Sequence, residues 1–244
     1  MLNDLMLLTG NDIPFPAAQI TIHQPTIKEI GLIGEEQFFT GHQILNFSKD
    51  ILTEEDKVNL EDKSNFDILI AILREQNAVM QYNRNCAKLV LALIFPEYEI
   101  FIEKDKIKLV KESQEYKIDN SNYEEFKQII GSMFEIKSDN SEQSSFNPSG
   151  ALAKKIADKL KKRQQTLLES KPKQKIDILS RYISILSVGL QESLTDLSNY
   201  TVYQLFDKFK RYELKMGYDI YVQAKMAGAK DLKEVEDWMK DIHS

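Results

Sequence analysis

The chain has 244 residues, of which 42% are hydrophobic and 29% charged. This is the composition of ordinary folded proteins and excludes a disordered or fibrous chain. The formal net charge of -6 argues against a protein that coats nucleic acid with its whole surface, because phosphate binding needs concentrated positive charge. Cys86 is the single cysteine, so no intrachain disulfide can form, and we expect a reducing compartment such as a cytoplasm.

The sequence contains no pattern typical of membrane insertion. Residues 1–8 are apolar but include Asp4, and they lack a positive segment and a cleavage pattern. The longest apolar run, 89–95, is far shorter than the roughly 20 residues that a membrane-spanning helix needs. We therefore predict a soluble protein without a signal peptide.

Near the N-terminus, alternation over residues 19–23 predicts a short strand. Thr26 and Glu29 have the spacing of a capping box, so a helix is expected to begin there. Gly34 falls inside the pattern that follows, and we expect the helix to break near it.

The middle of the chain predicts helices around a small sheet. Ser64 is a plausible N-cap for a helix whose apolar residues run from Phe66 to Ala78, and residues 85–95 predict a second helix that is apolar on nearly all sides and therefore buried. The predicted strands cover residues 98–103, 106–110 and 116–118. A helix is then expected to begin at Ser121 or Asn122, with an apolar stripe formed by Tyr123, Phe126, Ile129, Ile130, Met133 and Phe134.

The composition changes sharply at residues 138–150, which are rich in polar residues, proline and glycine and predict a linker. Beyond it, the pattern is helical throughout. The predicted helices cover residues 151–169, 176–190, a long segment from Asn199 or Thr201 to about Gly228, and residues 232–242. We therefore predict a mainly α protein of the α+β class, with a helical domain over 1–137 that carries a small antiparallel sheet, and an all-α region over 151–244.

No constellation of residues points to catalysis. His23, His42 and His243 are scattered, without metal-site spacing, and are interpreted as incidental surface or helix-end residues. No serine lies in a nucleophile elbow, and Cys86 lacks the signature of an activated thiol. We therefore predict that the protein is not an enzyme, with no catalytic, cofactor-binding or metal residues and no cofactor.

A basic segment stands out between Lys154 and Lys175, where nine basic residues face Asp158 and Glu169, a net charge of +7. Three interpretations stay open: a solvated helix, a surface for an acidic protein partner, and a site for nucleic acid or anionic lipid. No aromatic residue is interleaved with the basic ones, which disfavours single-stranded nucleic acid.

The last long helix is unusually aromatic. Its apolar face is formed by Val202, Leu205, Phe206, Phe209, Tyr212, Met216 and Ile220. Such a stripe is typical of a core helix, but several tyrosines fall outside it, and a surface rich in tyrosine and methionine suits a protein interface. The candidate partner-binding residues are Lys155, Lys159, Lys162, Arg163, Tyr203, Phe206, Tyr212, Tyr218, Tyr221 and Trp238.

Three stretches resemble a known family: ITIHQPTIKEIGLIGEEQFF, FPEYEIFIEKDKIKLV and YTVYQLFDKFKRYELKMGYDIYVQAKMAGAKDLKEVEDWMKDI. They are similar to tail-assembly chaperones of phages and prophages of Gram-positive bacteria. The resemblance implies a helical factor in the bacterial cytoplasm that binds the phage tape-measure protein, the tail tube protein or both, and keeps the tape measure soluble during tail assembly. It offers no catalytic residues.

Two other functions remain as alternatives. One is a structural component of the virion, such as a tail or baseplate subunit. The other is a nucleic-acid-binding protein that uses residues 154–175, although the acidic composition disfavours it.

Overall fold

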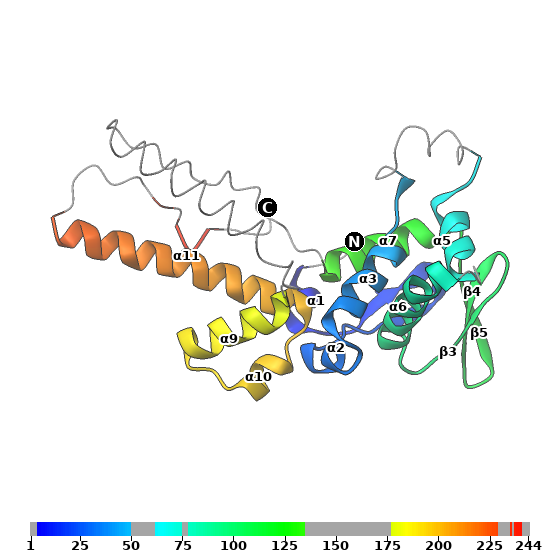
Figure 1. Cartoon of the computed structure of the whole chain (residues 1–244), viewed down its shortest axis with the longest axis horizontal. Helices are drawn as coiled ribbons and strands as arrows, with labels where there is room; N and C mark the ends of the chain where they lie inside the picture. The colour runs from blue at the N-terminus through cyan, green and yellow to red at the C-terminus, as the bar shows by residue number, and fades with distance from the viewer. Residues whose placement is uncertain are drawn as a thin grey trace. The chain divides into compact units, whose positions relative to one another are not determined.

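The computed structural model describes residues 4–49, 62–74, 78–134, 177–228, 235 and 237–240. These residues form a mainly helical structure with two small antiparallel sheets, so the predicted α+β class is confirmed (Figure 1). The elements are α1 (Asp4–Thr9), β1 (Ile13–Phe15), the 3-10 helix η1 (Pro16–Ala18), β2 (Ile20–Ile22), α2 (Ile27–Ile33), α3 (Glu35–Leu45), α5 (Asn65–Arg74), α6 (Ala78–Ile94), β3 (Glu99–Ile102), β4 (Lys106–Lys111), β5 (Gln114–Asp119), α7 (Tyr123–Phe134), α9 (Ile178–Leu190), α10 (Leu194–Ser198) and α11 (Val202–Met226).

The predicted capping box at the start of α2 is confirmed. The Glu29 carboxylate accepts a hydrogen bond from the Thr26 backbone N–H at 2.7 Å, and the Thr26 hydroxyl accepts one from the Glu29 N–H at 3.3 Å. The predicted break is also present, because Gly34 separates α2 from α3 with a φ of 92°. Glycine adopts this conformation without the steric cost that a Cβ would add.

The three predicted strands in the middle of the chain form a meander in the order β3-β4-β5. Its register pairs Ile100 with Leu109 and Ile107 with Ile118, and the last three of these side chains are fully buried. The predicted strand over residues 19–23 is β2, whose partner β1 was not predicted from the sequence. Helix α1 was not predicted either.

The core of the N-terminal part is formed by apolar faces of α3, α5, α6 and α7. All six residues of the predicted α7 stripe are buried. At the centre, the ring of Phe126 lies 6.1 Å from those of Phe15 and Phe95, and the Tyr123 hydroxyl donates to the Leu45 carbonyl at 2.9 Å. The stripe therefore joins α7 to strands and helices from across this part of the chain.

Two predictions about α6 were wrong. The helix begins at Ala78, not near Asn85, so Ala78 belongs to α6 and not to the preceding helix. It is also not buried on all sides, because Lys88 and Leu89 are exposed. The helix packs against α3 and α5, whereas Lys88 and Leu89 reach solvent.

The C-terminal helices belong to the same compact unit as residues 4–134. Thr26 and Thr201 form an antiparallel β-bridge, in which the Ile27 N–H donates to the Tyr200 carbonyl at 2.8 Å. The Gln204 side chain donates to the Leu8 carbonyl at 2.8 Å. The predicted linker over 138–150 lies outside the described residues, as do the helix over 151–169 and most of the one over 232–242, and the domain boundaries stay a prediction.

Thr201 begins α11 with a second capping box, in which its hydroxyl accepts from the Gln204 N–H at 3.3 Å and its own N–H donates to the Gln204 side chain at 2.8 Å. Because Thr201 is buried, Thr201→Ala is expected to lower the free energy of unfolding by about 1 kcal/mol. Urea titration measures this change. Thr201→Ser keeps the hydroxyl and should recover most of it; equal losses for both variants would contradict a capping role.

None of the helices within the described ranges combines the length and hydrophobicity that crossing a bilayer requires.

Candidate interaction surface

The first half of α11 packs into the core. Val202 and Leu205 are fully buried, and Phe206, Phe209 and Tyr212 lie half-buried against the core on the same face of the helix. This part of the aromatic stripe is therefore structural, as its spacing indicated.

Helix α9 covers this half of α11 through aromatic contacts. The rings of Tyr182 and Phe209 are stacked, with centroids 3.7 Å apart and planes 2° apart, and Phe206 meets the Tyr182 ring edge-on at 5.0 Å. Near the end of α9, Gly189 lies so close to the Tyr212 ring that a Cβ there would overlap its hydroxyl. Tyr182 and Gly189 therefore fix two of the candidate partner-binding residues, Phe206 and Tyr212, against α9.

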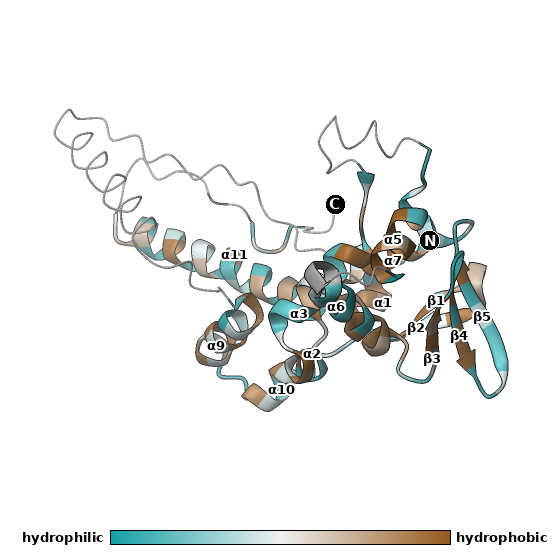
Figure 2. Ribbon diagram, turned by 45° about the vertical axis from the view of Figure 1, so that its right-hand side comes forward, coloured by the Kyte–Doolittle hydropathy of each residue, from teal (hydrophilic) through white to brown (hydrophobic). Residues whose placement is uncertain are grey.

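The second half of α11 continues the same apolar face without a cover. Met216 and Ile220 follow Phe209 and Tyr212 at helical spacing, but they are 43% and 60% exposed. Tyr218 and Met226 are also exposed, at 37% and 83%, but Tyr218 lies two residues from both Met216 and Ile220 and therefore on the opposite side of the helix. We call Met216 and Ile220 the exposed α11 surface; Figure 2 shows brown and teal residues alternating along this helix.

More apolar side chains are exposed where α9 ends and α10 begins. Val188 and Leu190, on either side of Gly189, and Leu194 all reach solvent. Because Gly189 contacts Tyr212, this group lies near the point where α11 leaves the core. None of these three residues was among the candidate partner-binding residues, because the apolar pattern over 176–190 does not reveal which side of the helix is covered.

The structure places the other candidate residues as follows. Tyr203 is half-buried against the core, and Tyr221 is half-buried with the Lys225 ammonium 5.6 Å from its ring centroid. Trp238 is half-buried, and the Arg211 guanidinium on α11 donates to its carbonyl at 3.1 Å. The four basic candidates, Lys155, Lys159, Lys162 and Arg163, lie outside the described residues.

The side chains of His23 and Cys86, two reactive residue types, make contacts that are typical of structural residues. His23 hydrogen-bonds to Asp12 at 2.9 Å and to Glu29 at 3.3 Å. Burial opposes its protonation, but the two carboxylates outweigh this effect and raise its pKa. The Cys86 thiol is buried, and burial raises its pKa, which lowers its reactivity. Across the described ranges, no three His, Cys, Asp or Glu residues are grouped as a metal site would require.

His42 lies in the last turn of α3, at a helix end as predicted; the residue is half-buried, and its Nε2 atom is buried. Its ring meets the Phe134 ring edge-on, with centroids 5.2 Å apart. Burial lowers the pKa of His42 from 6.5 to about 4. Between these pH values the unfolded chain binds a proton that the folded chain does not, so stability falls as the pH falls.

We expect this single group to cost about 3 kcal/mol of folding free energy between pH 6.5 and pH 4, at about 1.4 kcal/mol per pKa unit. His42→Gln removes the titration, so its free energy of unfolding should fall less than that of the wild type over this range. Denaturant titrations at several pH values measure both curves. If the two curves of unfolding free energy against pH run parallel, the pKa of His42 does not differ between the folded and the unfolded chain.

A family model matches the C-terminal part of the chain. Residues 171–243 match a family model described as the YomV second domain, which represents a protein of the Bacillus phage or prophage type. The match spans α9, α10 and α11 and covers less than half of the chain; it suggests a phage-associated protein. It does not specify tail assembly, which stays a prediction. Neither the curated proteins nor the solved structures gave a match.

Proposed function

We propose that this chain is a phage tail-assembly chaperone, a non-catalytic protein that binds the tape-measure protein in the bacterial cytoplasm. The observation that carries the proposal is the exposed α11 surface, on which an apolar helix face runs on beyond the core. The similarity of residues 171–243 to a phage-type protein supports a role in a phage or prophage.

The physical basis is the burial of apolar surface. A tape-measure protein is a long, helical and partly apolar chain that would aggregate before assembly, because exposed apolar surface drives association. A helix with a free apolar face can pack against an amphipathic helix of such a partner. Met216 suits this role, because methionine adapts to partners of different shapes.

Co-expression with the tape-measure protein of the same phage tests the proposal. We expect the tape-measure protein to be soluble only in the presence of this chain, and a complex of the two to elute from a size-exclusion column. Equal solubility with and without this chain, together with separate elution, would contradict the proposal.

A structural component of the virion is the second candidate, because similarity to a phage-type protein fits it equally well. Mass spectrometry of purified particles separates the two. A chaperone is expected to be absent from the finished particle, whereas a tail or baseplate subunit would be present in proportion to the other tail proteins.

A further inference from the structure

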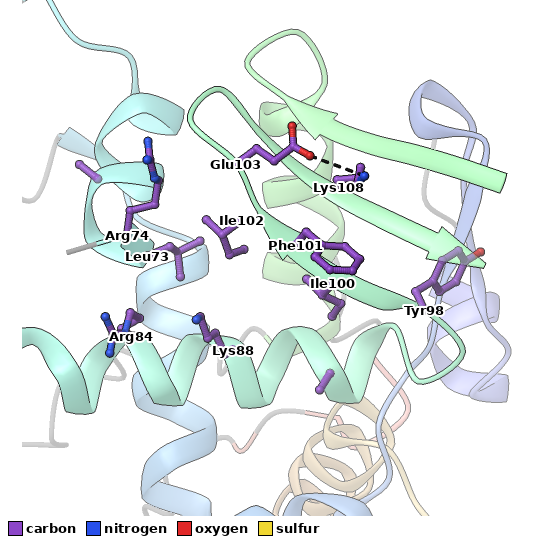
Figure 3. A pocket seen from close by; sticks show the side chains of 12 residues that line it. Leu73, Arg74, Arg84, Lys88, Tyr98, Ile100, Phe101, Ile102, Glu103 and Lys108 are labelled. Atoms are coloured by element: carbon purple, nitrogen blue, oxygen red, sulfur yellow. Dashed lines mark ion pairs between the residues drawn. The ribbon is translucent and has the colours of Figure 1, made fainter. Parts of the chain in front are cut away.

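A groove of about 1250 Å³ lies between helices α5 and α6 on one side and strands β3 and β4 on the other (Figure 3). Arg74, Arg84 and Lys88 line it from the helices. Phe101 and Ile102 line it from β3, which is an edge strand of the three-stranded sheet. The groove thus has a basic wall and an apolar wall.

The charges of the groove are unbalanced on the helix side. On the strand side, the Lys108 ammonium lies 3.7 Å from the Glu103 carboxylate and 3.1 Å from that of Glu115, so its charge is compensated. Arg74 and Lys88 are exposed, and neither residue forms an ion pair within the described ranges. Two cations that form no ion pair within the described part of the chain therefore line the helix side of this groove.

The strand side offers apolar contact area. Phe101 is 46% exposed, and the Lys108 ammonium lies 5.3 Å from its ring centroid. An exposed phenylalanine on an edge strand is costly in water. Burying it under a ligand with apolar groups would recover that cost.

We propose that this groove binds an acidic, amphipathic peptide segment of a partner protein. Carboxylates of the segment pair with Arg74 and Lys88, while its apolar side chains cover the exposed ring of Phe101. The net charge of -6 favours a short acidic peptide over a nucleic acid, which could stack a base on Phe101 but carries a negative charge at every phosphate. The site is separate from the exposed α11 surface and does not depend on the proposed function.

Fluorescence anisotropy tests the site with the full chain and a short fluorescein-labelled peptide in which glutamate alternates with leucine. We expect binding that weakens with added salt, since the attraction is partly electrostatic. Lys88→Glu and Arg74→Glu should each weaken it about tenfold. Lys88→Gln should give a smaller loss, and Phe101→Ser should weaken binding without changing its salt dependence.

Lys28→Glu is the matched control, because Lys28 is also an exposed helical lysine but lies on α2, away from the groove. It should leave the affinity unchanged. The proposal is overturned if Lys28→Glu and Lys88→Glu have equal effects, if a peptide with lysine in place of glutamate or serine in place of leucine binds as well, or if a single-stranded oligonucleotide binds more tightly. Absence of binding would also overturn it.

Discussion

Replacing Gly41 with valine is expected to lower the free energy of unfolding by about 3 kcal/mol, the upper end of the usual cost of overpacking a core. Gly41 is buried in α3 where that helix crosses α6. A Cβ at this position would overlap the Cys86 carbonyl oxygen, and it would lie 2.6 Å from Val90 Cγ2. Because the overlapping atoms of Cys86 belong to the backbone of α6, the overlap is removed only if the two helices move apart. Thermal and urea unfolding followed by circular dichroism measure the loss.

Gly31→Val is the matched control, because Gly31 is also helical but a Cβ there would meet nothing within 4 Å. Its effect on the free energy of unfolding is expected to stay within about 0.5 kcal/mol. If the two valine variants unfold alike, then α3 and α6 do not approach each other as closely as described.

The second large effect is expected on binding and not on stability. Replacing both Met216 and Ile220 with glutamate places two charges on the exposed α11 surface, where a bound partner would have to bury them. Burying an unpaired charge is costly, so we expect the affinity for the tape-measure protein to fall at least about tenfold. Glutamate is a good helix former, so α11 should persist. Isothermal titration calorimetry or a pull-down measures the loss.

Two comparisons isolate this surface. Leu32→Glu changes an apolar residue on α2 that is even more exposed, at 85%, and should leave the affinity intact. Phe209→Ala removes the ring that stacks on Tyr182 and should lower the unfolding temperature. Equal losses of binding for the Leu32 variant and the double glutamate variant would assign the effect to charge alone.

Short-range signals in the sequence were sufficient for most helix starts. The capping box at Thr26 follows from residue types three positions apart, and Thr201 was one of the two predicted caps of the last long helix; both residues cap helices in the structure. The three strands of the meander were recognisable from alternation and turn residues. Strand β1 was missed because three residues, one of them a proline, are too few to establish a period.

Contacts between distant segments could not be predicted. Periodicity identifies the apolar face of a helix but not the length over which other elements cover it. This limit explains why α6 was expected to be buried all round, and why the stripe on α11 did not reveal that cover ends after Tyr212. The close approach at Gly41 and the groove beside Lys88 likewise depend on pairs of helices and strands that no local pattern brings together.

Hydrogen–deuterium exchange on the purified complex with the tape-measure protein gives the most direct test of whether the exposed α11 surface binds that protein. We expect backbone amides from Glu213 to Met226 to exchange more slowly in the complex than in the free chain, while those of α5 and α7 stay unchanged. A complex that forms without any added protection between Glu213 and Met226 would contradict the account.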